Sequence, residues 1–289
     1  MTTSSMSNGV GSSLHYTNPE ITPDPQNPVY DGQVNLKYGI GPLPQELQNK
    51  KIFFFDIDNC LYERSTKIHD MMQVKIHEYF KANLKLSDED AHKLHISYYT
   101  TYGLALEGLV RNHQVDALEY NSQVDDSLDL KSVLSYNPKL RQTLLDIKQN
   151  QDYDLFWLIT NAYKTHALRV VSFLGLGDLF DGLTFCDYAQ SPIICKPMDQ
   201  FFFNTLKNVN IDYNDKQVMQ KQSFVDDSEI NVKAAHRLGF GLVIHYIEID
   251  SDYEKIKSKS DFKEYYGNGD NSDKSKIQII RSILELNKI

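Results

Sequence analysis

The chain contains 289 residues, of which 41% are hydrophobic, 11% aromatic and 24% charged, and these proportions exclude collagen, a coiled coil and wholesale disorder. With 30 Lys and Arg against 39 Asp and Glu, the net charge of -9 disfavours broad binding to nucleic acid or to an anionic membrane. A small anionic ligand therefore needs a local positive site.

The sequence also argues against a membrane span and against export. No uninterrupted apolar run approaches the ~20 residues that cross a bilayer, and the N-terminal region lacks the basic and apolar segments of a signal peptide. The three cysteines, Cys60, Cys186 and Cys195, are widely spaced and form no Cys-x-x-Cys pair, so we expect reduced thiols. We expect a cytoplasmic protein, with the nucleus left open as a second compartment.

Residues 1–48 are rich in Pro, Gly, Ser, Thr and Asn and show no sustained apolar period. This composition predicts a flexible N-terminal tail, part of which could lie along the folded body.

From Lys51 onward, short apolar runs alternate with helical patterns. The runs at residues 52–55, 154–159, 222–225 and 241–245 are typical of buried strands, and helices are expected at 163–174, 197–209 and 229–238. This alternation predicts an α/β fold with a parallel sheet that is covered by helices on both faces. Residues 248–274 are predicted to form a long surface loop, with or without a short helix, before a last helix at 274–287.

One interval breaks the alternation, because the segment between Asp56 and Thr160 is far longer than the ~30 residues of a single crossover unit. Helical patterns at residues 66–84, 88–99, 104–111 and 115–124 predict a helical cap over residues 65–136. The catalytic core then comprises residues 49–64 and 137–289.

Acidic pairs follow two of the predicted strands. Asp56 and Asp58 come after the first strand, and Asp226 and Asp227 come after the third. Adjacent carboxylates at a buried strand end repel each other, so a divalent cation is the simplest compensation. Either pair alone could instead be a solvated turn or the acidic start of a helix.

Two further polar clusters stand at equivalent places. Thr160 and Asn161 end the second strand and can donate to an oxyanion, and Lys196 precedes a proline-started helix where an ammonium could meet a phosphate. Taken singly, each could be a helix cap or a surface lysine. Because the carboxyl ends of parallel strands meet at one edge, we expect all four clusters to converge there.

In the order Asp-x-Asp, Thr, Lys, Asp-Asp, the clusters resemble the motifs of the haloacid dehalogenase-like (HAD) hydrolases. The sequences FFFDIDNCLY at residues 53–62, TNA at 160–162 and DDS at 226–228 are similar to those of the fungal pyrimidine 5'-nucleotidases. Cys60 departs from the Thr or Val that the broader superfamily favours. The resemblance implies a Rossmann-like core with a helical cap inserted after the first strand, Mg2+ dependence and nucleoside monophosphate substrates.

The resemblance also implies a role for each matching residue. Asp56 is the nucleophile that forms an aspartyl-phosphate, and Asp58 is the acid and base, whose main-chain carbonyl also binds the metal. Asp227 is the expected direct metal ligand, and Asp226 reaches the ion directly or through water. Thr160, Asn161 and Lys196 bind the phosphate. Since Asp58 must first donate a proton, we expect its surroundings to raise its pKa.

Substrate selection is expected to lie in the cap, where the candidates for contact with base or ribose are Tyr102, Arg111, Asn112 and His113. The implied partner is a small phosphate monoester, with no nucleic acid or membrane. The sequence is compatible with a monomer and leaves the oligomeric state open. Alternatives are a phosphatase of other small monoesters, such as purine nucleotides, nicotinamide mononucleotide, sugar phosphates or lysophosphatidate, and a non-catalytic regulator that kept the fold.

Overall fold

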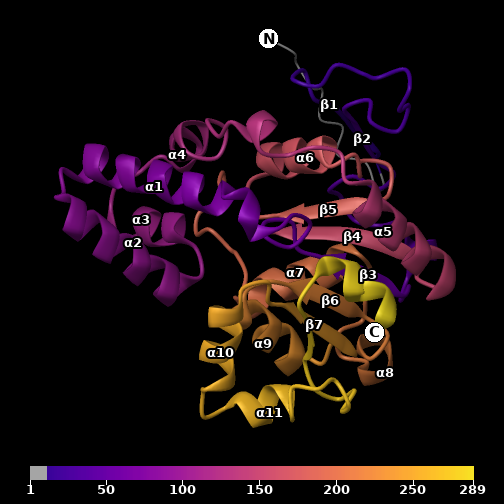
Figure 1. Ribbon diagram of the computed structural model, residues 1–289. Helices are drawn as coiled ribbons and strands as arrows, with labels where there is room; N and C mark the ends of the chain where they lie inside the picture. The colour runs from indigo at the N-terminus through magenta and orange to yellow at the C-terminus, as the bar shows by residue number, and fades with distance from the viewer. Residues whose placement is uncertain (1–11) are drawn as a thin grey trace.

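Six parallel strands form the central sheet in the computed structural model, which describes residues 12–289 (Figure 1). Their order across the sheet is β5-β4-β3-β6-β7-β8. The α/β fold with a parallel sheet is confirmed. The bounds of the strands are β3 (Ile52–Phe55), β4 (Leu155–Thr160), β5 (Gly182–Phe185), β6 (Ser223–Asp226), β7 (Leu242–Tyr246) and β8 (Gln278–Ile280).

Strand β3 divides its side chains between two hydrophobic cores because successive residues point to opposite faces of the sheet. Phe53 and Phe55 pack with α5 (Pro138–Asn150) and α6 (Lys164–Phe173) on one face. Ile52 and Phe54 pack with α7 (Asp199–Asn208) and α9 (Glu229–Arg237) on the other. Burial on both faces explains why the run is apolar at every position.

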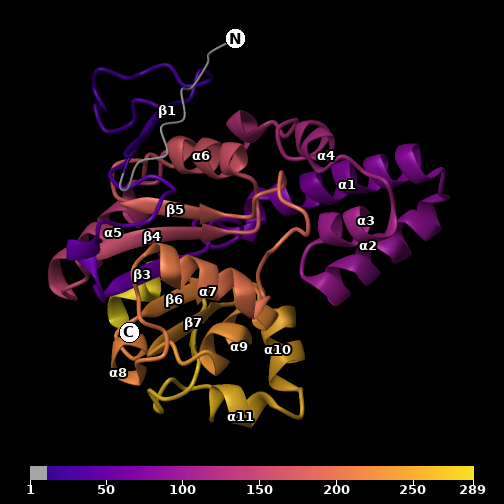
Figure 2. The same ribbon diagram turned by 180° about the vertical axis from the view of Figure 1, so that it is seen from behind.

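Four helices occupy the interval in which a cap was expected, and they pack around a third core that includes Ile76, Phe80, Leu106 and Tyr120. Cys186, Tyr188, Ile193 and Cys195, from the segment after β5, complete this core. Figure 2 shows them beyond the carboxyl ends of the sheet strands. We call this group the cap. Its helices are α1 (Ile68–Leu84), α2 (Asp88–Tyr102), α3 (Ala105–Asn112) and α4 (Ala117–Gln123).

The expectation of a flexible tail over residues 1–48 is wrong for residues 12–48, and residues 1–11 lie outside the described residues. Strands β1 (Leu14–Thr17) and β2 (Gln33–Leu36) form an antiparallel pair. Val34 and Leu36 are fully buried in the same core as Phe53. Alternate burial of two apolar residues anchors a segment whose composition otherwise resembles a loop.

The C-terminal region also differs from expectation. The polar stretch expected to be mainly a loop contains two helices, and the expected last helix is replaced by β8, which pairs with β7, and by a 3-10 turn. The apolar run of β8 is too short for a helix, and pairing with β7 satisfies its backbone hydrogen-bonding groups instead. The remaining elements are α8 (Lys216–Met219), α10 (Asp250–Lys257), α11 (Phe262–Tyr266), η1 (Gln45–Leu47), η2 (Arg64–Thr66), η3 (Leu130–Ser132) and η4 (Ile283–Lys288).

No helix within residues 12–289 combines the length and the apolar character that crossing a membrane requires.

Candidate active site

Three carboxylates from two neighbouring strands meet at the carboxyl edge of the sheet. Asp56 follows β3, Asp226 ends β6 and Asp227 comes next, and one oxygen from each lies within 4.8 Å of the others. Burial raises the pKa of Asp56, and the charge of Asp226 raises it further. Burial and the same charge raise the pKa of Asp227 to about 8. The ionised trio therefore requires compensating positive charge, which suits a divalent cation with oxygen ligands.

Lys196 supplies part of that charge from within the protein. Its Nζ lies 2.7 Å from Asp56 Oδ1 and 2.6 Å from Asp226 Oδ2, and it donates to the carbonyl of Ile159 at 3.1 Å. Although burial lowers the pKa of Lys196, the charges of Asp226 and Asp56 raise it to a net value above its usual range. The ammonium thus stays charged in a fully buried position.

The loop that carries Lys196 is held from two sides. Asn161 Oδ1 accepts from the Lys196 main-chain N–H at 2.7 Å, and its Nδ2 donates to the Lys196 carbonyl at 2.9 Å. The cap contributes Gly103, where an added Cβ would lie 2.5 Å from Pro197 Cδ and 2.6 Å from the Lys196 carbonyl oxygen. Asn161, expected to bind phosphate, therefore uses its side chain to hold Lys196, and α7 begins two residues after Pro197.

The two aspartates at the end of β6 differ in their surroundings. Asp226 is fully buried, and its oxygens accept from Asn231 Nδ2 at 3.1 Å and from the Ser228 main chain at 2.8 Å. Asp227 lines the cavity instead, whereas its carbonyl accepts from His245. Asp227 therefore faces the space in which a metal would lie, and its role as the more direct ligand stays a prediction. Thr160 also lines the cavity, and its hydroxyl accepts from the Ala162 main chain at 3.0 Å.

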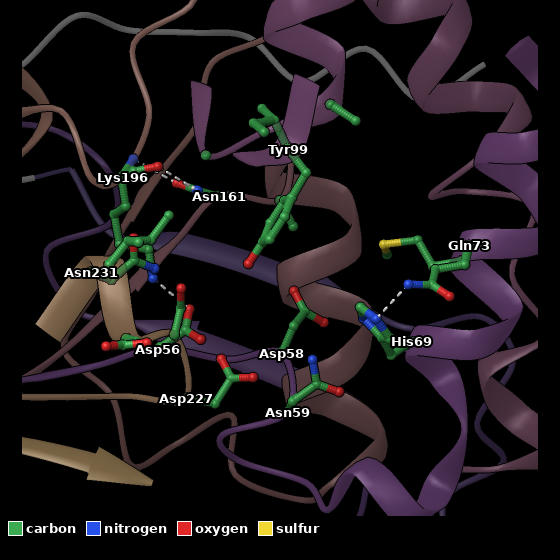
Figure 3. A pocket seen from close by; sticks show the side chains of 18 of the residues that line it. Asp56, Asp58, Asn59, His69, Gln73, Tyr99, Asn161, Lys196, Asp227 and Asn231 are labelled. Atoms are coloured by element: carbon green, nitrogen blue, oxygen red, sulfur yellow. Dashed lines mark hydrogen bonds and ion pairs between the residues drawn. The ribbon is translucent and has the colours of Figure 1, made fainter. Parts of the chain in front are cut away.

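Asp58 lies beside Asp56 and Asp227 and faces the same space (Figure 3). Its Oδ1 is 2.7 Å from His166 Nε2 and 2.7 Å from the Tyr62 hydroxyl. Burial raises the pKa of Asp58, but the charge of His166 and the two hydrogen bonds outweigh burial, so the net pKa lies below its usual range. The expectation of a raised pKa is therefore wrong, because it was argued from the proton that Asp58 must donate, and the sequence did not reveal His166 and Tyr62 as its partners.

A cavity of about 630 Å³ extends from these residues to the inner side of the cap. None of the four predicted cap residues is among the described residues that line it. The Arg111 guanidinium lies over the Tyr102 ring and pairs with Glu107, Asn112 donates to the Gly108 carbonyl, and His113 Nε2 is 2.9 Å from the Tyr98 hydroxyl. These side chains thus contribute to the packing of helices α2 and α3. A sequence pattern alone cannot distinguish side chains that pack helices from side chains that contact a ligand.

The cap residues that do line the cavity come from α1, from α2, from the start of α3 and from α4; they include His69, Gln73, His95 and Tyr99. His69 Nε2 and Gln73 Nε2 are 2.9 Å apart, and Figure 3 shows this pair at the far end of the space from Asp56. Sequence reasoning missed both residues, although their spacing of four places them on one face of α1 beside Met72 and Ile76.

Comparison with known proteins adds independent findings. The model of the haloacid dehalogenase-like hydrolase family matches residues 50–239. Phosphate metabolism protein 8 of Saccharomyces cerevisiae is 40% identical over 260 residues, which cover 88% of this chain and 77% of that protein. The solved structure of the magnesium-bound HAD-hydrolase YfnB from Bacillus subtilis has a TM-score of 0.50 at 11% identity and covers 83% of this chain and 97% of its own. L-2-haloacid dehalogenase from Xanthobacter autotrophicus has a TM-score of 0.44 at 14% identity, and the match covers 83% of this chain and 97% of that chain.

Proposed function

Since the chain belongs to the haloacid dehalogenase-like hydrolase family, we propose that it is a Mg2+-dependent phosphomonoesterase that hydrolyses nucleoside 5'-monophosphates, preferably UMP and CMP. The observation that carries this proposal is the buried Lys196 ammonium, which bridges Asp56 and Asp226 beneath a cavity that Asp58 also lines. A nucleophile, a cation and a second carboxylate thus face one space.

The first step transfers the phosphoryl group to the protein. An Asp56 carboxylate oxygen attacks phosphorus, the bond between phosphorus and the ester oxygen breaks, and that oxygen takes a proton from Asp58 as it leaves. Asp58 is protonated for this step when the bound phosphate dianion, a like charge beside it, raises the pKa that His166 and Tyr62 lower in the substrate-free protein. The phosphate dianion repels the attacking carboxylate, so the charge of Lys196 and the hydroxyl of Thr160 are needed beside it.

The second step hydrolyses the aspartyl-phosphate and regenerates free Asp56. Asp58, now ionised, takes a proton from a water molecule whose oxygen attacks phosphorus, and the bond from phosphorus to Asp56 breaks. Inorganic phosphate leaves, and Asp58 keeps the proton that it took from water. One carboxyl group therefore acts as acid and then as base.

The acidic trio suits a magnesium ion. Asp56 and Asp227 would hold Mg2+ through their carboxylates, with Asp226 and the main-chain carbonyl of Asp58 as further ligands. The raised pKa values of Asp56 and Asp227 reflect burial and mutual repulsion that a divalent cation would offset. When bound, the ion supplies charge neutralisation to nucleophile and phosphate.

The nucleotide preference rests on the similarity of the motifs to the pyrimidine nucleotidases and on the size and lining of the cavity. A roofed cavity of about 630 Å³ accommodates a small metabolite and hinders a folded phosphoprotein. His69 and Gln73 offer polar groups to the part of the substrate remote from the phosphate.

A phosphate-release screen tests the proposal. The purified protein is assayed with UMP, CMP, AMP, nicotinamide mononucleotide, sugar phosphates and lysophosphatidate, each with Mg2+ and with EDTA. We expect Mg2+-dependent release that is fastest with UMP or CMP. Equal rates across bases would remove the pyrimidine preference and keep the phosphatase, whereas no release from any ester would favour a non-catalytic regulator.

A further inference from the structure

The Asp58 carboxylate is held through only one of its two oxygens. Oδ1 accepts hydrogen bonds from both His166 Nε2 and the Tyr62 hydroxyl, each at 2.7 Å. Because Tyr62 donates to Oδ1, this oxygen is an acceptor, and His166 Nε2 is its second donor. No hydrogen bond to Oδ2 occurs within residues 12–289. Oδ2 is therefore free to contact a ligand in the cavity that Asp58 lines.

We propose that His166 and Tyr62 are positioning residues that orient Asp58 so that Oδ2 carries the transferable proton toward the leaving oxygen. This inference rests on the proposed function, in which Asp58 is the acid. A carboxyl group whose Oδ1 already accepts two hydrogen bonds holds its own proton on Oδ2. The two donors thus determine both where the carboxyl group lies and which oxygen faces the substrate.

Both donors come from segments that also carry catalytic groups. Tyr62 lies four residues after Asp58 in the turn that follows β3, and His166 lies in the first turn of α6, which begins just after Thr160. The carboxyl end of β4 thus places Thr160 at the phosphate site and, through the start of α6, also places His166 beside Asp58. Side-chain exposure is 0% for His166 and 24% for Asp58, so the histidine supports the carboxylate from behind.

A purely structural explanation accounts poorly for His166. Its Nδ1 is buried without a hydrogen-bond partner among the described residues, which costs free energy that an apolar side chain at the same place would avoid. His166 therefore brings a buried polar ring to a place where its only side-chain hydrogen bond in the described part of the chain goes to Asp58.

The leaving group distinguishes positioning from a structural role. Nitrophenolate departs from p-nitrophenyl phosphate without a proton, whereas the 5'-alkoxide of UMP needs one, and both esters need Asp56 and Lys196. We therefore compare kcat/KM for the two esters, because kcat/KM covers steps up to departure of the alcohol and excludes later hydrolysis of the phosphoenzyme.

We expect Tyr62→Phe and His166→Leu each to lower kcat/KM for UMP by about tenfold or more, within the ~100- to 10,000-fold contribution of a complete general acid. The loss with p-nitrophenyl phosphate should stay below about threefold, and His166→Gln, which keeps an N–H donor, should recover part of the UMP activity. Tyr153→Phe is the matched control, since it removes another buried tyrosine hydroxyl bond, 2.7 Å to Ser223, at the amino edge of the sheet. Melting temperatures report whether each variant folds.

Equal losses with both esters, or no loss with either, would overturn the inference while leaving the phosphatase intact. Wild-type protein that hydrolyses neither ester would overturn the proposed function and this inference together. If the wild type hydrolyses p-nitrophenyl phosphate but not UMP, only the nucleotide class fails, and the fastest alkyl phosphate of the screen takes the place of UMP in the same comparison.

Discussion

Asp56 is the side chain on which the proposed chemistry depends most directly. Asp56→Asn keeps the shape of the residue and can still accept a hydrogen bond from Lys196, but it removes the nucleophilic oxygen. We expect turnover of UMP and of p-nitrophenyl phosphate to fall by at least about 1,000-fold, with an unchanged circular dichroism spectrum. Near wild-type hydrolysis by a folded Asp56→Asn variant would contradict the assignment of the nucleophile.

His95 links protonation to the stability of the cap. Burial, together with the nearby charges of His92, His69 and His77, lowers the pKa of this histidine to about 4. The fold therefore favours neutral His95, and its contribution to stability is complete above the usual histidine pKa of 6.5 and is lost as pH falls toward about 4. We expect the difference in unfolding free energy between wild type and His95→Gln to shrink across this window in urea titrations. A difference that stays constant with pH would contradict this assignment.

The strands that carry the catalytic motifs are the elements that the sequence predicts best. Strands β3, β4, β6 and β7 lie within two residues of their predicted bounds, because each is a short apolar run buried on both faces. Their carboxyl ends then bring Asp56, Thr160 and Asp227 together, as parallel topology requires. The edge strands β5 and β8 escape prediction because their sequences, GLTF and QII, contain too little apolar pattern.

Residues that act through contacts between distant segments could not be predicted in the same way. His166 and Tyr62 carry ordinary helix and turn patterns, and only the fold brings both to Asp58. The predicted cap residues show the converse, since aromatic and amide groups such as Tyr102 and Asn112 suit either ligand binding or helix packing. In the structure the Tyr102 ring lies against Arg111 of α3, and Asn112 donates to the Gly108 carbonyl within α3, so both side chains take part in the packing of the cap.

The loop between α2 and α3 couples the cap to Lys196 through Gly103. A side chain there would meet the Lys196 carbonyl, and the φ of +82° also favours glycine. We expect Gly103→Ala to displace Lys196 and to lower kcat by about tenfold or more with both UMP and p-nitrophenyl phosphate, because small misplacements of catalytic groups are costly.

Gly239→Ala is the matched control for this variant. Gly239 has a φ of +90° but nothing within 4 Å of an added Cβ, so the substitution strains the backbone without a clash. We expect a modest loss of stability and unchanged kcat. Equal kcat losses in the two variants would show that strain, rather than contact with Lys196, explains the effect of Gly103→Ala.

The N-terminal segment joins the same cooperative unit as the catalytic core, although its composition resembles a tail. Leu36 is fully buried with Phe53 and Phe55, and the neighbouring Asn35 donates its main-chain N–H to Gly177 at 2.9 Å. We expect Leu36→Ala to lower the free energy of unfolding by about 3 kcal/mol, the usual cost of such a cavity. Urea unfolding measures this loss, and Gln33→Ala, at an exposed position of the same strand, should change it by less than about 0.5 kcal/mol. If the two variants were equally stable, residues 12–48 would have to detach from the core without cost.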